Sequence, residues 1–325
     1  MSARPGRLAA AVVAVSCAAA CLAPARGPLR VGVNAWPGYE YLYLADVKGF
    51  YAAEGIEVRL LEFGSLSDTR RAYERGQLDM MGATVIEGLV IRDASPRRPR
   101  VVRVVDYSNG PDVIIAQPWI TRGDQLRGAR VGVEMAALPV FLLARGLEDF
   151  GLTVRDVRTA SMDQTAMEEA FRRGDLDAVV TYPPTSVRLT REMETTRLFS
   201  SADAPHEILD VLLAESDVVR DRGDEVRALL RAFDRAVAYA ERQPADATAI
   251  MAQREGITPE EFSAALSGGI VLVGADQQAP YFRPGGALER ALRVAGRLLV
   301  AAGQLRAAPA PGSLVDPLFI EEARP

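Results

Sequence analysis

The sequence predicts an α/β protein with two doubly wound lobes that are joined by two crossing segments. The chain has 325 residues, which at about 150 residues per domain is enough for two domains with their own cores. One strand–helix–strand–helix–strand pattern occurs twice, and two apolar extended segments bracket the second copy. Hydrophobic residues make up 49% and charged residues 25% of the chain. This composition is typical of globular proteins and excludes a disordered or fibrous chain.

The N-terminus predicts an export signal. Two arginines precede the apolar run Leu8–Ala20, which is shorter than the about 20 apolar residues of a membrane-spanning helix. Residues 1–20 therefore indicate a secretory signal peptide. Ala18–Cys21 resembles a bacterial lipobox, in which Cys21 would become the lipidated first residue of the mature chain. The small residues Ala23–Ala25 fit cleavage after Ala25 instead. We expect the lipid anchor at Cys21, with cleavage after Ala25 as the alternative.

The first copy of the repeat lies in residues 28–112, the N-terminal part of lobe 1. Apolar runs with strand character alternate with segments of helical spacing, and glycines end the helices as left-handed caps. The expected elements are a strand at Val31–Asn34, a helix at Tyr41–Tyr51, a strand at Ile56–Phe63, a helix ending at Gly76 and a strand at Met80–Ala83.

The second copy lies in residues 113–210, lobe 2 with the crossing segments. It repeats the strand Val131–Glu134, the helix Phe141–Phe150 and the strand Thr153–Ala160. A shared Gly-x-Leu-Asp follows the second helix in both copies, at Gly76–Asp79 and at Gly174–Asp177. Short links between alternating strands and helices predict parallel sheets that are covered on both faces.

Two apolar segments, Asp112–Ala116 and Asp210–Ala214, are expected to carry the chain out of lobe 1 and back. Residues 211–325 then contain the return crossing and a helical part that completes lobe 1. Helices are expected at Asp221–Gln243, after the capping box that starts at Thr258, and at Gly286–Gln304. The arginine-rich stretch 92–103 contains two prolines and no aromatic residue, and is expected to form a solvated turn.

The composition also excludes several classes of function. The chain has one histidine, His206, and two cysteines, Cys17 and Cys21. These numbers exclude multi-histidine metal sites, zinc ribbons and disulfides within the mature domain. The net charge is −5 and no basic patch with aromatic residues occurs, so nucleic acid is not an expected partner. We predict no metal, no cofactor and no catalytic residue, and we assign His206 a structural or surface role.

Two facing α/β lobes predict a ligand site between them, because ligands bind beyond the carboxyl ends of the strands in open α/β sheets. The candidate ligand-binding residues are those in the loops and helix starts that follow the strands, and those beside the first crossing. They are Asn34, Trp36, Tyr39, Ser65, Ser67, Thr84 and Glu87 in the first copy, Ser108 and Asp112 near the crossing, and Glu134 and Tyr182 in the second copy.

Two groups of candidates have a structural alternative. Trp36 and Tyr39 stand beside a proline and a glycine in a loop, where aromatic rings offer a flat apolar face to an organic ligand. A hydrophobic staple on the following helix is the other interpretation. Ser65 and Ser67 open a helix, so one of them is expected to cap it and to leave backbone N–H groups facing the cleft. Capping alone also accounts for these serines.

The charges of the candidates favour a nitrogenous ligand. The loops 34–39 and 64–68 contain no arginine, whereas Glu87, Asp112 and Glu134 supply acceptors. Buried carboxylates repel an anion and suit an amine or an aminopyrimidine. In the alternative, these carboxylates brace the hinge and helix ends, and backbone N–H groups form an anion site for a ligand such as a sulfonate.

Several segments, taken in order, resemble the nitrate/sulfonate/taurine (NitT/TauT) family of ABC-transporter substrate-binding proteins. They are Val31–Tyr39, Leu42–Tyr51, Tyr73–Asp79, Leu126–Glu134 and Phe171–Tyr182. The resemblance implies a type II periplasmic-binding-protein fold and a small-molecule ligand that a monomer delivers to permease and ATPase subunits. It also implies an exported protein that reaches the membrane only through a lipid anchor. Relatives of this kind include proteins that bind thiamine precursors.

The resemblance brings in two rival functions. A fungal enzyme of thiamine-pyrimidine synthesis has the same fold and uses a lysine and a histidine with a pyridoxal cofactor, and a cysteine-rich motif. Here the only lysine is Lys48, at an expected helix end, and no cysteine cluster follows the export signal. We therefore expect no enzyme. The ligand-binding subunit of a sensory system fits the same fold and remains open.

Overall fold

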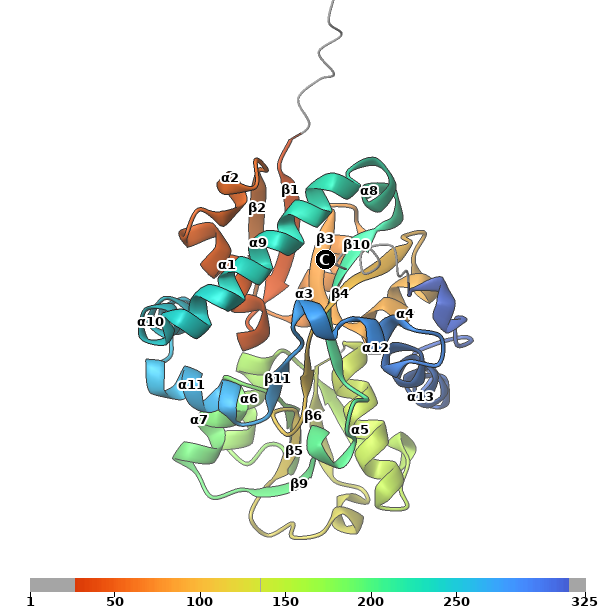
Figure 1. Ribbon diagram of the computed structural model, residues 1–325. Coiled ribbons are helices and arrows are strands. Elements are labelled where there is room, and N and C mark those ends of the chain that lie inside the picture. Colours follow the sequence, from red (N-terminus) through yellow and green to blue (C-terminus); the bar gives the residue numbers. More distant parts are fainter. Residues whose placement is uncertain (1–26, 135, 316–325) are drawn as a thin grey trace, which may run out of the picture.

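The two halves of the molecule lie one above the other (Figure 1), each built around its own sheet. The computed structural model describes residues 27–134 and 136–315. The expected signal peptide and Cys21 lie outside these residues. Within the described ranges, no helix combines the length and hydrophobicity that crossing a membrane requires.

The first lobe is built on a six-stranded sheet with the order β11-β4-β10-β3-β1-β2. Three of its strands are parallel, and two others, β10 and β4, are antiparallel to each other and to their next neighbours. The strands are β1 (Leu29–Asn34), β2 (Val58–Phe63), β3 (Met80–Thr84), β4 (Pro99–Ser108), β10 (Leu209–Glu215) and β11 (Ile270–Leu272).

The second lobe is built on a five-stranded sheet with the order β7-β6-β8-β5-β9. Strands β7, β6 and β8 are parallel, and β5 is antiparallel to β8 and to β9. The strands are β5 (Val113–Ala116), β6 (Arg130–Val133), β7 (Arg158–Ser161), β8 (Ala178–Thr181) and β9 (Thr196–Ser200).

The expectation of parallel sheets is therefore confirmed for the strands of the two repeats, β1 to β3 and β6 to β8, and is wrong for the crossing segments. The two apolar segments assigned to the crossings are the strands β5 and β10, and each enters its sheet from the side of the other lobe. Val113 pairs with Thr181 and Asp210 pairs with Thr84, both at the carboxyl end of a parallel strand. A strand that starts at this edge must run opposite to its neighbours. The chain passes between the sheets at residues 109–112 and 201–208.

The sequence repeat has a packing explanation in the first strand of each copy. A Cβ atom at Gly32 would lie 2.3 Å from Leu78 Cδ1, and one at Gly132 would lie 2.7 Å from Leu176 Cδ1. The leucine of each Gly-x-Leu-Asp thus packs directly on the glycine of the Val-Gly-Val strand. The aspartate that follows accepts the backbone N–H of the same strand, from Arg30 to Asp79 at 2.9 Å and from Arg130 to Asp177 at 2.7 Å.

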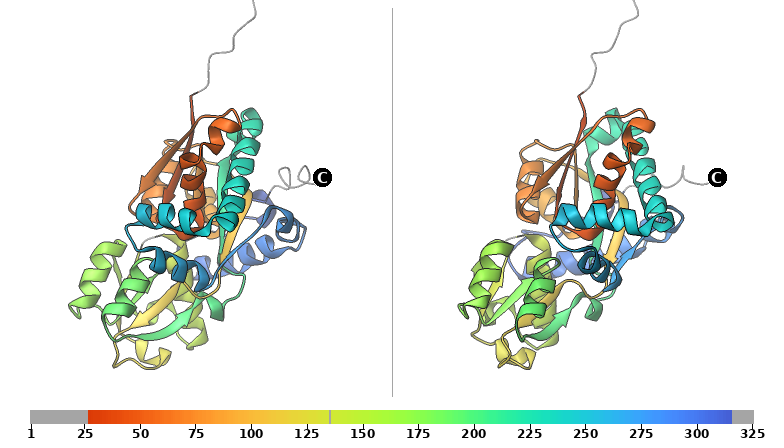
Figure 2. Two further views of the ribbon diagram at one scale, coloured as in Figure 1. Left: turned by 60° about the vertical axis from the view of Figure 1, so that its left-hand side comes forward. Right: turned by 90° about the vertical axis from the view of Figure 1, so that its left-hand side faces the viewer.

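Helices cover both sheets, and the turned views of Figure 2 keep the same two-lobe arrangement. The first copy contributes α1 (Glu40–Val47), α2 (Phe50–Ala53), α3 (Leu66–Glu74) and α4 (Val85–Ala94), and the second copy α5 (Ala137–Asp149), α6 (Gln164–Arg172) and α7 (Thr185–Glu192). The remaining helices are α8 (Ser216–Asp221), α9 (Gly223–Arg242), α10 (Pro244–Glu255), α11 (Pro259–Ser267), α12 (Ala279–Phe282) and α13 (Ala287–Ala301).

Several predicted boundaries change for local reasons. The helix expected at 41–51 divides into α1 and α2 because Gly49 adopts a left-handed conformation with φ of 69°. The helix expected at 221–243 is α9, which begins two residues later, after the separate short helix α8. The strand expected at 153–160 becomes a 3-10 turn and the strand β7. The capping box of α11 forms as predicted, since the hydroxyl of Thr258 accepts the N–H of Glu261.

The expectation of a solvated turn at 92–103 is wrong for its second half, which begins β4. Arg103 is buried there and pairs with Asp234 at 2.6 Å. Its guanidinium lies 4.9 Å from the centroid of Phe233 on α9. This arginine holds α9 to the sheet.

Hydrogen bonds join the two crossings to each other. The hydroxyl groups of Ser108 and Ser201 are 2.7 Å apart, and the N–H of Gly110 donates to Ser201 Oγ at 2.6 Å. Helix α13 also packs against α4 of the first lobe and α5 of the second. His206 is exposed on the return crossing and its ring lies 4.3 Å from that of Tyr107, which agrees with the surface role expected for it.

Candidate ligand-binding site

A small cavity lies between the lobes, at the carboxyl ends of the central strands. Its volume is about 20 Å³, which holds about one water molecule. It is lined from both lobes by Asn34, Trp36, Tyr39, Leu66, Thr84, Asp112, Leu138, Tyr182 and Asp210. None of these lining residues is basic. An organic solute enters this space only if the lobes separate.

The indole of Trp36 connects the two lobes. Its Nε1 donates to Asp106 Oδ2 at 3.2 Å, and its ring meets that of Tyr182 edge-on with centroids 6.4 Å apart. Trp36 belongs to the first lobe and Tyr182 follows β8 of the second. The pair forms an aromatic wall, and opening of the cleft would break it.

Tyr39 lies deeper, on the floor of the first lobe. Its ring packs over Gly82 of β3, where a Cβ atom would lie 3.1 Å from the ring carbons. Its hydroxyl donates to Asp210 Oδ1 at 2.7 Å. The chain makes this approach in the short 3-10 helix Pro37–Tyr39, which turns back towards the sheet directly after β1.

Asp106 and Asp210 form a buried acid pair on neighbouring strands β4 and β10. Burial raises the pKa of Asp106 to about 7 and raises the pKa of Asp210 well above its ordinary range. The negative charges of Asp106 and Asp112 raise the pKa of Asp210 further. The pair therefore holds a proton more tightly than a free carboxyl group does, because two adjacent carboxyl groups cannot both ionise cheaply.

Asp112 is the third buried carboxylate of the site. Burial raises its pKa to about 6, and a hydrogen bond from Ser108 opposes this rise. Its Oδ2 atom and Oδ1 of Asn34 are both buried without a hydrogen-bond partner. Buried acceptors without a donor are costly. Both residues line a cavity that holds about one water molecule, so a water or a ligand can supply the missing donors.

Two further glutamates link the lobes beside the cavity. Glu87 on α4 accepts the backbone N–H groups of Ala137 and Leu138, at 2.6 and 3.1 Å. Glu134 accepts the backbone N–H of Ser67 at 3.0 Å, and it also accepts the hydroxyl of Tyr182 at 3.1 Å. Burial raises the pKa of Glu87 to about 7, while nearby Arg70 and the two N–H donors favour its charged form.

The structure places the eleven candidate residues in three groups. Asn34, Trp36, Tyr39, Thr84, Asp112 and Tyr182 line the cavity. Ser67, Glu87 and Glu134 make contacts between the lobes beside it. Ser65 and Ser108 lie behind these residues: Ser65 caps α3 by accepting the N–H of Asp68, as one interpretation predicted, and Ser108 joins the crossings.

Sequence reasoning missed four residues of the site, namely Asp106, Asp210, Leu66 and Leu138. Asp106 was part of the polar segment before the first crossing, and Asp210 opens the return segment. A signal was present in both cases, because each aspartate is a charged residue beside a buried apolar run. Only the pairing of β4 with β10 brings the two together.

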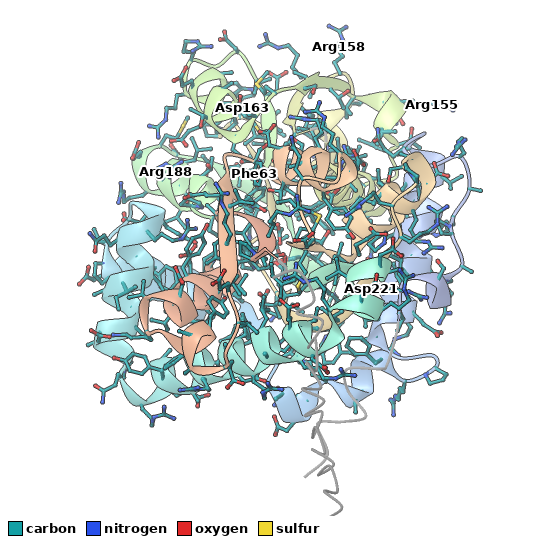
Figure 3. All side chains as sticks on the ribbon, turned by 90° about the horizontal axis from the view of Figure 1, so that it is seen from above. Phe63, Arg155, Arg158, Asp163, Arg188 and Asp221 are labelled. Carbon is teal, nitrogen blue, oxygen red and sulfur yellow. The ribbon has the colours of Figure 1, made fainter. Side chains whose placement is uncertain are left out.

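Other groups that bear on the rival functions lie away from the cavity. Lys48 ends α1 and pairs with Asp246 on α10 at 2.6 Å. Among the residues that the structure describes, no three histidine, cysteine, aspartate or glutamate side chains are grouped to hold a metal ion. Figure 3 shows side chains filling both lobes, with Arg155 and Arg158 directed outward at the rim of the second lobe.

Comparison with known proteins assigns the chain to a family. A family model described as NMT1/THI5 like matches residues 36–247. This range contains the second lobe, four of the six strands of the first lobe, and every lining residue of the cavity except Asn34. The chain belongs to the NMT1/THI5-like family.

A curated relative of this chain is an enzyme. It is 4-amino-5-hydroxymethyl-2-methylpyrimidine phosphate synthase of Aspergillus parasiticus, which is 24% identical over 237 residues. The match covers 66% of this chain and 66% of the enzyme, so this member of the NMT1/THI5-like family spans about two thirds of the length of that relative.

Solved structures with the same fold include binding proteins and an enzyme, the desulfurization enzyme DSZB, which has a TM-score of 0.62 at 18% identity and covers 91% of this chain and 98% of that one. The alkanesulfonate-binding protein SsuA of Xanthomonas axonopodis pv. citri, bound to MOPS, has a TM-score of 0.72 at 18% identity, covering 88% of this chain and 97% of that one. The periplasmic nitrate-binding protein NrtA of Synechocystis PCC 6803 has a TM-score of 0.74 at 14% identity, covering 91% and 88%. The NMT1/THI5-like chain thus has the mixed α/β periplasmic-binding-protein fold that was expected.

Proposed function

We propose that this NMT1/THI5-like protein is an extracytoplasmic solute-binding protein of an ABC importer. It closes its two lobes on a small nitrogenous solute, of aminopyrimidine type, and delivers the solute to permease and ATPase subunits as a monomer. The fold shared with periplasmic binding proteins supports the transport role, and the export signal that the sequence predicts in residues 1–20 supports the location.

One observation supports the ligand class above the others. The cavity between the lobes presents Asn34 Oδ1 and Asp112 Oδ2 as buried acceptors without partners, and its lining contains no basic residue. A nitrogen base supplies N–H donors to these atoms and a flat ring to Trp36 and Tyr182. A sulfonate or nitrate would supply further acceptors to a wall that already holds acceptors without partners and no basic side chain, which costs several kcal/mol.

A binding panel tests the proposal. Thermal-shift measurements would compare aminopyrimidines, thiamine and polyamines with taurine, alkanesulfonates and nitrate, followed by calorimetry on every hit. We expect a nitrogen base to bind, and Asp112→Asn to weaken that binding at least tenfold. Asp175→Asn is the matched control, since Asp175 lies in an exposed ion pair with Arg173. Tight binding of a sulfonate that survives Asp112→Asn would contradict the ligand class and leave the transport role in place.

The same proposal includes attachment to the membrane through Cys21. Cys21→Ser is expected to release the protein into the periplasmic fraction with an unchanged circular dichroism spectrum. Globomycin is expected to block processing of the wild-type chain. N-terminal sequencing that finds cleavage after Ala25 would show a freely diffusing periplasmic protein instead.

Two rival functions have separate tests. A sensory subunit would be encoded beside a receptor kinase, whereas an importer subunit would be encoded beside permease and ATPase genes. The enzyme alternative rests on the Aspergillus parasiticus relative and needs an amine in the cleft for Schiff-base chemistry. Lys48 is paired with Asp246 on the outer face of α1 and α10. Lys48→Arg is therefore expected to leave solute affinity unchanged, and a Lys48-dependent turnover of the solute would favour the enzyme.

A further inference from the structure

Glu87 and Glu134 make reciprocal contacts between the two lobes. Glu87 lies in α4 of the first lobe, and its Oε1 atom accepts the N–H groups of Ala137 and Leu138 in the first turn of α5. Glu134 follows β6 of the second lobe, and its Oε1 atom accepts the N–H of Ser67 in the first turn of α3. Each lobe thus places one carboxylate on a helix N-terminus of the other lobe.

Both helix ends lie at the cavity. Leu66 begins α3 and Leu138 is the second residue of α5, and both line the cavity wall. The first N–H groups of a helix and its dipole make a site for an anion. In a cleft that lacked these two glutamates, α3 and α5 would therefore present two anion-binding ends to an entering solute.

The local sequence of α5 supplies no side-chain cap for the start of this helix. The N-cap of α5 is Ala136, which has no side chain that accepts a hydrogen bond. Serine, threonine, aspartate or asparagine would ordinarily stand there. The cap comes instead from the opposite lobe, from a side chain that is fully buried.

Glu134 is held in its place by its own lobe. Its Oε2 atom accepts the hydroxyl of Tyr182 at 3.1 Å and lies 3.5 Å from Nε2 of Gln164. Gln164 in turn accepts the hydroxyl of Thr181 at 2.7 Å. These contacts orient the carboxylate before the lobes meet, so that its other oxygen is free to reach α3.

We propose that Glu87 and Glu134 are resident anions of this cleft, which fill the anion-binding ends of α5 and α3 and so exclude anionic solutes. This inference deepens the proposed function by naming what sets its selectivity. Helix N-termini favour anions, but with the two glutamates in place the ends of α3 and α5 no longer disfavour a nitrogenous solute. Sulfonates and nitrate meet carboxylates where they would need N–H donors.

The experiment removes each glutamate in turn and adds a small anion in solution. Glu134→Ala and Glu87→Ala would be titrated with formate, acetate, methanesulfonate and nitrate at constant ionic strength set with chloride, and binding would be followed by thermal shift and calorimetry. We expect the wild-type protein to show no anion-specific stabilisation. Each alanine variant is expected to melt at a lower temperature and to bind formate or methanesulfonate at least tenfold more tightly than wild type.

Three control variants separate charge from packing. Glu169→Ala removes an exposed glutamate of α6 that is 68% accessible, and is expected to behave as wild type. Glu134→Gln and Glu87→Gln keep the volume and one acceptor, and are expected to fold even where an alanine variant does not. They are expected to lower the melting temperature without gaining anion binding, because the amide still fills the helix end.

Three results would overturn the inference: specific binding of methanesulfonate or nitrate by the wild-type protein, folded alanine variants that gain no anion binding, or glutamine variants as stable as wild type. Its failure is distinguishable from failure of the proposed function. If no nitrogen base binds but Glu134→Ala gains an anion site, the proposed solute class is wrong and the resident anions remain.

Discussion

The hydrogen bond between Asp106 and the indole of Trp36 runs through space that a side chain on residue 38 would fill, and residue 38 is a glycine. A Cβ atom on Gly38 would lie 1.9 Å from Asp106 Oδ2 and 3.0 Å from Trp36 Nε1. Because neither group has room to retreat in a buried site, Gly38 is a condition for the Trp36–Asp106 hydrogen bond. At the scale of single residues, the site therefore depends on a glycine that touches no ligand.

Gly38→Ala is expected to displace Asp106, to lower the free energy of unfolding by about 1–3 kcal/mol and to reduce solute affinity at least tenfold. Urea unfolding and calorimetry would measure both effects. Gly312→Ala is the control, since nothing lies within 4 Å of a Cβ atom there. A Gly38→Ala protein with wild-type affinity would show that the Trp36–Asp106 contact is not needed for binding.

The buried carboxylates predict a specific pH dependence of stability. Burial raises the pKa of Asp112 from 3.8 to about 6, so the folded protein holds a proton that the unfolded chain releases near pH 4. The stability that this group contributes is present below pH 4 and is lost as the pH rises through 6. The loss is on the order of 3 kcal/mol, at about 1.4 kcal/mol per pKa unit.

Asp112→Asn removes this titration together with the repulsion of Asp106 and Asp210. The difference in unfolding free energy between variant and wild type is therefore expected to move in favour of the variant between pH 4 and pH 7. Urea titrations at pH 4.5, 5.5, 6.5 and 7.5 would measure it, with Asp175→Asn as a flat reference. Parallel pH profiles for Asp112→Asn and wild type would refute a raised pKa.

At the scale of elements, the repeated Val-Gly-Val strand and Gly-x-Leu-Asp turn form one packing unit that occurs twice. Leu78 covers Gly32, and Asp79 holds both the backbone and the guanidinium of Arg30. The second lobe repeats the leucine contact at Gly132 and Leu176. The sequence repeat therefore reflects strand packing, and it predicted β1, β3 and β6 within a few residues.

Gly32→Ala is expected to lower the unfolding free energy by about 1–3 kcal/mol because its methyl group overlaps Leu78. Leu78→Val shortens the side chain that the new methyl group would overlap. The unfolding free energy of the Gly32→Ala/Leu78→Val variant is therefore expected to fall by at least about 0.5 kcal/mol less than the sum of the two single-variant losses. A double-mutant cycle in urea measures this coupling, with Gly64→Ala, which has open space, as control. Strict additivity would mean that the two positions are not in contact.

At the scale of the whole molecule, the small volume of the cavity requires motion. The contacts that close the cleft are Trp36 with Tyr182, Glu87 with α5, Glu134 with α3, and the ion pair of Arg191 on α7 with Glu261 on α11. All of them join the two lobes, and the crossings at 109–112 and 201–208 are the hinges available for opening.

Opening before binding predicts a rate limit. Trp119 is 62% exposed and lies outside the cavity lining, so Trp119→Phe leaves Trp36 as a single reporter inside the cleft. In stopped-flow fluorescence, the observed rate is expected to reach a plateau as the solute concentration rises, because lobe opening becomes limiting. A rate that increases linearly to high concentration would indicate that the solute binds an already open protein.

The sequence by itself determined the number of lobes, their α/β character and most strand positions, because hydrophobic periodicity, glycine caps and an internal repeat are local signals. It also determined six residues of the cavity lining, since loops after parallel strands meet at one sheet edge. The tertiary structure alone shows that β5 runs antiparallel to β8 and β10 antiparallel to β3, because each strand enters its sheet from the side of the other lobe. Two further features could be seen only in the tertiary structure. One is the acid pair of Asp106 and Asp210, and the other is the contact that Glu87 and Glu134 each make with a helix of the opposite lobe. These groups are far apart in sequence, so no local pattern predicts which helix N-terminus a buried carboxylate will contact.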